Sequence, residues 1–148
     1  MNLKHLGVLL AVVALASGCS CKRKMEGMGN IAMAEAGKNV RDINFGFDSY
    51  SLDSSSKAVL DGNVAYLKEN PSITAQIEGH CDERGTNEYN MVLGVNRAKA
   101  VMDYVVASGL ASNRFTTVSY GEEVPLDPAH TEEAWAANRR AHFAVSGN

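Results

Sequence analysis

Between residues 40 and 145, segments with the two-residue period of a β-strand alternate with segments with the period of an α-helix. The strand segments are residues 43–47, 73–79, 115–119 and 141–145. The helical segments lie between Asp53 and Asn70, from about Asn87 to Ser108, and from Thr131 to Ala137. This alternation predicts an α+β fold, a βαβαβ(α)β two-layer sandwich with helices packed on one face of a small mixed sheet. At least one strand pair should be parallel, because helical crossovers join successive strands.

The ends of the predicted helices carry recognisable signals. Asp53 or a neighbouring serine can act as the N-cap of the first helix, and Asn70 followed by Pro71 should end it. Gly109 suits the position just after the second helix, where the backbone often turns left-handed. The apolar positions that define the second helix include Val92, Val95, Met102, Val105 and Val106.

The first nineteen residues read as an export signal. A short charged start precedes an apolar stretch from Leu6 to Ala16, which is too short for a membrane-spanning helix of about 20 residues. The run from Leu15 to Cys19 resembles a bacterial lipobox, which implies cleavage before Cys19 and a lipid on that residue. Because Ser20 follows Cys19 where an inner-membrane lipoprotein would carry Asp, the resemblance implies the outer membrane. An ordinary signal peptide with a chance cysteine is the alternative.

These segments divide the chain into a signal peptide (1–18), a lipidated flexible tether (19–39) and one folded domain (40–148). The tether is rich in glycine and poor in large apolar residues, so it cannot bury much surface. The formal net charge of −3 comes from well-mixed acids and bases, which argues against nucleic-acid binding. Besides Cys19, only Cys21 and Cys81 remain, and we expect both to be unpaired.

Five motifs in the predicted domain belong together. They are Phe45 to Tyr50, Ile77 to Thr86, Tyr89 to Ala98, Val118 to Glu122, and Asn138 to Arg140. In this order they resemble the OmpA-like peptidoglycan-binding domain family. With the lipobox and tether, the whole chain is similar to the peptidoglycan-associated lipoproteins of Tol-Pal systems. The chain departs from the family pattern at Cys81, where Ala or Thr is commoner, and at Asn96, where close relatives often carry a second Arg.

The resemblance implies a ligand and the residues that bind it. The ligand is meso-diaminopimelate of the peptidoglycan stem peptide, whose free end carries an ammonium and a carboxylate on one carbon. Such a zwitterion needs one acid and one base held apart. The family's acid and base map onto Asp82, which would accept the ammonium, and Arg97, which would hold the carboxylate through two parallel N–H bonds.

Four further residues complete the predicted ligand site. Asn90 and Leu93 share a helix face with Arg97 because they stand at i, i+3 and i+7. Gly94 costs about 1 kcal/mol relative to Ala inside a helix, so it needs a packing or ligand reason. Asp48 would form the opposite wall. We expect Asp82 and Arg97 to lie at a solvent-open site.

Other interpretations of these residues stay open. Asp82 could cap the helix or pair with Arg84, and Arg97 could be a solvated surface residue. His80 and Cys81 beside Asp82 superficially suggest a metal site or a catalytic thiol, but the spacing supports neither, and we expect no metal and no cofactor. We expect Trp135 to anchor the last short helix. Glu122 should hold an arginine of the segment 138–140.

The sequence therefore predicts a non-enzymatic anchor that joins the outer membrane to peptidoglycan, with its domain facing the periplasm. The resemblance also implies TolB and other Tol proteins as partners, and a role in envelope integrity and cell division. A periplasmic hydrolase that acts on the wall is one alternative. A structural lipoprotein that binds only proteins is another.

Overall fold

The computed structural model describes residues 39–147. Its elements are β1 (Ile43–Asn44), α2 (Ser54–Glu69), β2 (Ile73–His80), α3 (Asn87–Ala107), a 3-10 turn η1 (Ser112–Arg114), β3 (Phe115–Gly121), α4 (Glu132–Asn138) and β4 (Arg140–Gly147). The predicted signal peptide, Cys19 and all but the last residue of the predicted tether lie outside the described residues, and they stay predictions. Within residues 39–147, none of the helices combines the length and apolar character that a membrane span needs.

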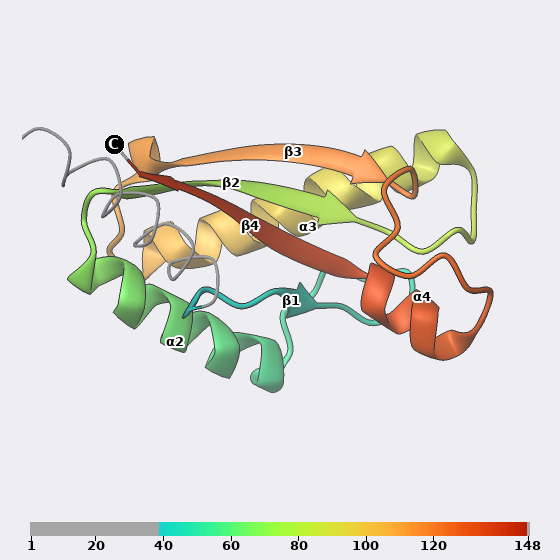
Figure 1. Cartoon of the computed structure of the whole chain (residues 1–148), viewed down its shortest axis with the longest axis horizontal. Helices are drawn as coiled ribbons and strands as arrows, with labels where there is room; N and C mark the ends of the chain where they lie inside the picture. Colours follow the sequence, from blue (N-terminus) through green and yellow to red (C-terminus); the bar gives the residue numbers. More distant parts are fainter. Residues whose placement is uncertain (1–38, 148) are drawn as a thin grey trace, which may run out of the picture.

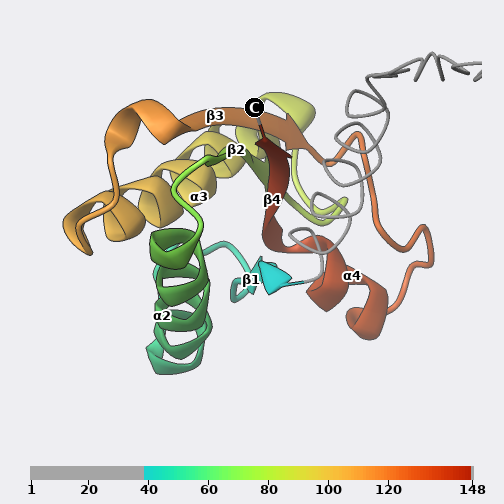
Figure 2. The same ribbon diagram turned by 60° about the vertical axis from the view of Figure 1, so that its left-hand side comes forward.

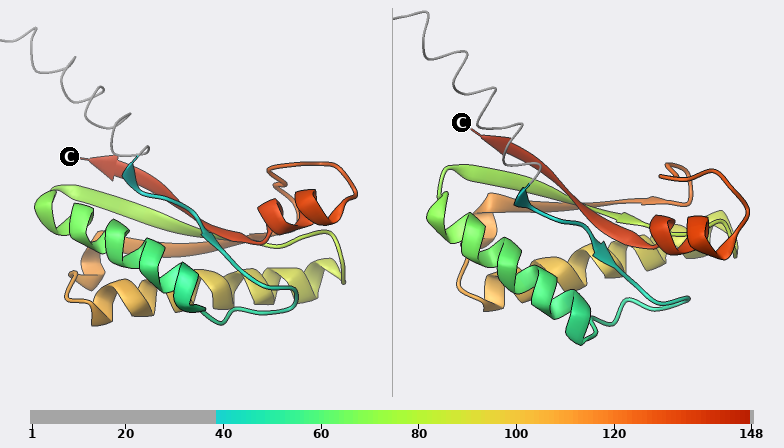
Figure 3. Two further views of the ribbon diagram at one scale, coloured as in Figure 1. Left: turned by 90° about the horizontal axis from the view of Figure 1, so that it is seen from below. Right: turned by 60° about the horizontal axis from the view of Figure 1, so that its bottom comes forward.

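The four strands form one mixed sheet in the order β1-β4-β2-β3. β2 and β3 are parallel, whereas β4 runs antiparallel to both β1 and β2. Figure 1 and Figure 2 show this order, and Figure 3 shows that α2 and α3 cover one face of the sheet while α4 lies at one end. The predicted α+β sandwich with a parallel strand pair is confirmed.

The helix ends follow the predicted signals. The Asp53 carboxylate accepts a hydrogen bond from the Ser56 amide at 2.7 Å and so caps α2, which ends at Glu69 just before Asn70. At the end of α3, the amides of Gly109 and Leu110 donate back to the carbonyls of Val106 and Val105. Gly109 adopts a φ of 96°, a conformation that glycine accepts without strain.

The first strand is shorter than its alternating pattern predicts. Pairing with β4 is confined to Ile43 and Asn44, and the Phe45 amide adds one bond to the Arg139 carbonyl. The chain then turns, with Asp48 at a φ of 50°. Phe47 therefore leaves the core and is 59% exposed, because alternation in sequence continues past the point where the backbone stops pairing.

Close backbone contact sets which face of α3 is buried. A Cβ atom on Gly79 would lie 1.9 Å from the Gly94 carbonyl oxygen, and a Cβ on Gly94 would lie 2.1 Å from the Ser119 hydroxyl oxygen. Packing this close requires glycine on both elements. With Gly94 against the sheet, Val92 and Val95 are exposed to solvent. Their apolar side chains had suggested that they face the core. The core side of α3 consists of Leu93, Ala98, Val101 and Val105.

Candidate functional site

Three loops meet at one end of the sheet. β2 and β3 are parallel, so their carboxyl ends point the same way, and the segments that follow them come together there. The turn after β1 and helix α4 reach the same end, on the right of Figure 1. The five sequence motifs are therefore adjacent in space, although Phe45 and Arg139, which are hydrogen-bonded, lie 94 residues apart in the chain.

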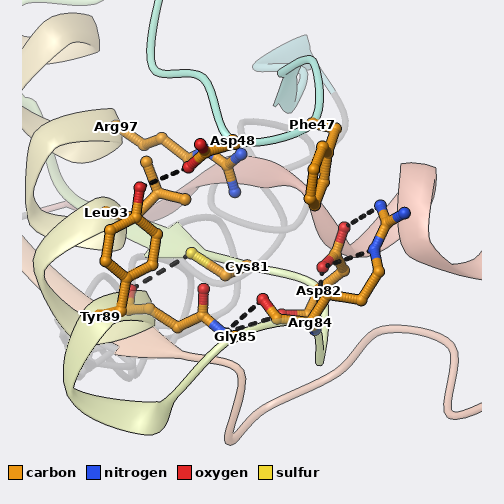
Figure 4. A pocket seen from close by; sticks show the side chains of 10 residues that line it. Phe47, Asp48, Cys81, Asp82, Arg84, Gly85, Tyr89, Leu93 and Arg97 are labelled. Atoms are coloured by element: carbon orange, nitrogen blue, oxygen red, sulfur yellow. Dashed lines mark hydrogen bonds and ion pairs between the residues drawn. The ribbon is translucent and has the colours of Figure 1, made fainter.

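A cavity of about 180 Å³ lies among these loops and the first turns of α3 (Figure 4). Its lining residues are Phe47, Asp48, Cys81, Asp82, Arg84, Gly85, Tyr89, Asn90, Leu93 and Arg97. Five of the six residues predicted to contact the ligand line it, and Asp82 and Arg97 share it. The loop between β2 and α3 therefore brings the predicted acid and base to one place.

Asp82 is nearly saturated with hydrogen bonds. Its Oδ2 accepts from Arg84 Nη2 at 2.6 Å and from Arg139 Nη1 at 3.1 Å. Its Oδ1 accepts from the Arg84 backbone amide at 3.1 Å and from Arg84 Nε at 3.2 Å. Burial raises the pKa of the Asp82 carboxyl, but the bonds from Arg84 and Arg139 outweigh burial and hold the pKa below its ordinary value. The pairing with Arg84 is the alternative interpretation of Asp82 that the sequence left open, whereas sequence reasoning did not anticipate the pairing with Arg139.

The Arg84 guanidinium lies between two aromatic rings. Its Cζ is 4.1 Å from the centre of the Phe47 ring and 4.3 Å from that of the Trp135 ring. The Trp135 indole N–H in turn donates to the Glu83 carboxylate at 2.9 Å. Trp135 is thus more than an anchor for α4, because it forms one wall of a slot that holds Arg84.

Arg97 is completely buried at the floor of the cavity. Its Nε donates to the Ser49 carbonyl at 2.8 Å, Nη1 to the His80 carbonyl at 2.8 Å, and Nη2 to the Gly46 carbonyl at 3.1 Å. In the part of the chain that the structure describes, Arg97 forms no ion pair with a carboxylate. Burial lowers the pKa of its guanidinium.

The expectation of a solvent-open site is therefore wrong for both charged residues. Asp82 is 3% exposed and Arg97 is 0% exposed. The physical reason is that Arg97 has a structural task, since it ties the turn after β1 to the end of β2. Arg97 nevertheless lines the cavity, and because a guanidinium has five N–H groups, its three bonds to carbonyls leave donors for a further acceptor.

Asp48 and Tyr89 also line the cavity (Figure 4). The Tyr89 hydroxyl donates to the Asp48 carboxylate, and this bond raises the pKa of the tyrosine. Asp48 lines the cavity, but the structure places it beside Arg97 and not on a separate opposite wall. Sequence reasoning missed Tyr89, although it precedes Leu93 by one helical turn and so lies near the same side of α3.

The Asn90 side chain holds the loop between β2 and α3 in place through hydrogen bonds. Its side-chain amide donates to the carbonyls of Asp82 and Arg84, each at 3.2 Å, and to the Glu122 carboxylate. The prediction that Glu122 holds an arginine of the segment 138–140 is wrong. Arg139 instead pairs with Asp82 and with Glu132, because α4 brings its own acid within 2.8 Å.

Gly94 does not line the cavity, contrary to its place in the predicted ligand site. It faces Gly79 and Ser119, so its reason is the close packing of α3 on the sheet. Its neighbour Leu93 does face the cavity and supplies apolar surface.

Cys81 and His80 have separate environments and do not form a thiol–imidazole pair. The Cys81 thiol donates to the Asn90 carbonyl at 3.2 Å, and burial raises its pKa to about 11, so it is a neutral thiol. The His80 ring stacks on Tyr120 at 5.5 Å. Across residues 39–147 no three His, Cys, Asp or Glu side chains come close enough to share a metal ion.

Known proteins are similar to this chain in sequence and in fold. Residues 44–139 match the OmpA family. The peptidoglycan-associated lipoprotein of Haemophilus influenzae is 38% identical over 147 residues, which cover 95% of this chain and 96% of that protein. The peptidoglycan-associated lipoprotein of Pasteurella multocida is 38% identical over 136 residues, covering 89% of this chain and 91% of that one.

Solved structures agree with these relatives. The crystal structure of the peptidoglycan-associated lipoprotein from Burkholderia pseudomallei superposes with a TM-score of 0.69 and 40% identity, covering 72% of this chain and 90% of that chain. The C-terminal domain of Helicobacter pylori MotB gives the same TM-score at 19% identity, covering 74% and 86%, and so shares the fold. The chain therefore belongs to the OmpA family and, within it, to the peptidoglycan-associated lipoproteins.

Proposed function

We propose that this protein anchors the outer membrane to peptidoglycan without a covalent link, by binding meso-diaminopimelate in the cavity between Asp82 and Arg97. One observation carries the proposal. A buried carboxylate and a buried guanidinium that forms no ion pair with any described carboxylate line the same small cavity. A buried charge without a counter-ion is costly, and a ligand that carries the missing charge removes that cost.

The cavity matches a short zwitterion with an aliphatic stem. Asp82 is the acceptor for the ligand ammonium, and the spare N–H groups of Arg97 are the donors for its carboxylate. Leu93 and the ring of Phe47 flank the space between them and can contact the methylene groups. Asp48 adds a second acceptor in the cavity.

The chemistry of the site favours an anchor over a wall hydrolase. A nucleophilic cysteine needs a thiolate and a positioned base. The Cys81 thiol is neutral, and its neighbour His80 is stacked on Tyr120. Asp82, the other candidate, is held as a carboxylate by two arginines and so cannot act as a general acid.

The proposal includes the lipid on Cys19 and the Tol partners. Two or more acyl chains make a stable membrane anchor, at about 0.8 kcal/mol per buried CH₂. Many tethered copies on one polymer can then bind the wall firmly even if each domain binds weakly. TolB is the first protein partner to test, by co-purification with the chain from an envelope extract. A Cys19→Ser chain should no longer fractionate with the outer membrane, and acylated protein in that variant would refute the lipid assignment.

The decisive experiment varies the ligand and keeps the protein intact. Titration of the full-length chain in detergent compares three stem peptides, which contain diaminopimelate, lysine or 2-aminopimelate at the third position. Lysine lacks only the side-chain carboxylate, and 2-aminopimelate lacks only the side-chain ammonium. Each loss should weaken binding roughly tenfold or more, since a hydrogen bond to a charged group contributes about 1.5–3 kcal/mol.

Each outcome has a defined meaning. Equal affinity for the lysine peptide would remove Arg97 from ligand recognition, and equal affinity for the 2-aminopimelate peptide would remove Asp82. If the chain bound neither the diaminopimelate peptide nor whole peptidoglycan, the remaining interpretation would be a structural lipoprotein that binds only proteins.

A further inference from the structure

The acid that the ligand ammonium needs is already occupied by a cation of the protein itself. Both oxygens of Asp82 accept two hydrogen bonds each, and three of these four come from Arg84. A carboxylate offers about four acceptor positions, so an incoming ammonium finds no free one. Figure 4 shows the Arg84 guanidinium lying beside the carboxylate at the cavity wall.

The two arginines on Asp82 differ in how firmly they are held. The Arg139 side chain is only 8% exposed, and it also donates to the Phe45 carbonyl at 3.1 Å and to Glu132 at 2.8 Å. The Arg84 side chain is 32% exposed, and beyond Asp82 its guanidinium contacts two aromatic rings and the edge of Glu132. Arg84 is therefore the cation that can leave.

Glu132 is a second acid within reach of the Arg84 guanidinium. Arg84 Nη1 is 3.6 Å from a Glu132 oxygen, and the Glu132 side chain is 60% exposed. A shift of the guanidinium toward Glu132 would free the Asp82 oxygens on the cavity side while an ion pair is kept. The shift would also move a positive charge relative to the indole of Trp135, which is the only tryptophan in the chain.

We propose that Arg84 is a resident counter-ion, which fills the ammonium position at Asp82 in the free protein and must withdraw toward Glu132 when ligand binds. This inference rests on the proposed function, because it concerns the same site. In the free site Arg84 and Arg139 balance the charges of Asp82 and Glu132, and ligand affinity is set by competition between Arg84 and the ligand ammonium for Asp82.

The test is a titration of the full-length chain with the diaminopimelate stem peptide, read by calorimetry and by Trp135 fluorescence. Arg84→Gln removes the competing cation, so it should bind roughly twofold to fivefold tighter than wild type, the range expected for a partly exposed ion pair. Lys68→Gln is the matched control, since it removes one positive charge on α2, beside Gly109 and far from the cavity. It should leave affinity unchanged.

Fluorescence of the wild-type protein gives a readout that needs no variant, and Arg84→Gln serves as its control. Saturation of the wild type should change Trp135 emission, and in Arg84→Gln that change should largely disappear. Weaker or equal binding by folded Arg84→Gln, or unchanged emission of the saturated wild type, would overturn the counter-ion role. Absence of binding by every protein would instead refute the proposed function, so the two failures are distinguishable.

Discussion

Arginine ties loops to strands at both ends of β2, but the two ends are built differently. At the start of β2, the half-buried Arg114 donates to the carbonyls of Ile73 and Asn70, both at 2.9 Å. At the end of β2, the fully buried Arg97 donates to three carbonyls from two segments. The bonds are alike, but water screens the first cation and is excluded from the second.

This difference separates a structural residue from a residue that can also recognise a ligand. A screened guanidinium gains little from an added anion, because water already solvates it. A buried guanidinium that lacks a counter-ion gains much from one.

Replacing the buried arginine should have the largest effect. Arg97→Met leaves three carbonyls without their donors, and each buried unsatisfied group costs about 1–3 kcal/mol, so we expect a loss of about 3 kcal/mol or more together with loss of ligand binding. Arg114→Met is the matched control and should cost about 1 kcal/mol or less, because water can replace its bonds. Urea unfolding measures both. Equal losses would show that burial does not distinguish the two ends.

Glycine provides the second comparison, between α3 at the site and α2 away from it. Gly94→Ala should destabilise by about 2–3 kcal/mol, since its methyl group would meet Ser119 and the Gly79 carbonyl. Gly62→Ala on α2 has only the tip of Arg41 at 4.0 Å, so it should stabilise by about 0.5–1 kcal/mol. Thermal unfolding should show shifts of opposite sign. If Gly94→Ala were neutral, the close packing of α3 would not be needed.

Two histidines on neighbouring strands should make stability respond to pH in opposite ways. Burial, assisted by the charge of Arg140, lowers the pKa of His80 to about 4. The unfolded chain then binds a proton between about pH 6.5 and pH 4 that the folded protein does not, so stability falls by roughly 3 kcal/mol as the pH is lowered through this window.

His142 acts in the other direction, since its hydrogen bond with Asp42 raises its pKa. Its contribution is fully present below about pH 6.5 and is lost as the pH rises through the raised value. Urea unfolding at pH 4.5, 6 and 8 measures the unfolding free energy against pH. Between pH 6 and pH 4.5 this free energy should change less in His80→Gln than in wild type, and between pH 6 and pH 8 it should change less in His142→Gln. The same slope in wild type and His80→Gln would contradict the buried neutral ring.

The smallest effect is expected at Cys81, the departure from the family pattern. Cys81→Ala removes one buried sulfur and a weak S–H bond to the Asn90 carbonyl, so it should cost about 1 kcal/mol and leave peptidoglycan retention intact. Calorimetric unfolding and a pull-down on purified peptidoglycan measure the two parts. Loss of retention in a folded variant would give the thiol a role in the site.

The order of the elements and the helix caps could be predicted from sequence, and the resemblance to the OmpA-like family indicated which segments form the site. Local chemistry decides these features: Asp53 caps α2 with its own side chain, and Gly109 accepts a positive φ. The period of the apolar residues placed β2, β3 and β4 correctly. It failed at Phe47 and at Val92, where apolar side chains are exposed.

The roles of the charged residues depend on contacts between distant segments and could not be predicted from sequence. Asp82 and Arg97 share a cavity because parallel pairing of β2 with β3 and the glycine contact of α3 bring their segments together. The same glycine contact explains why Gly94 does not line the cavity. The partners Arg139 and Trp135 come from the last fifty residues of the domain, and no local pattern in a sequence records which distant cation or ring will lie beside a carboxylate. Side-chain pairing across the fold depends on geometry over long separations, and that geometry exists only once the chain has packed.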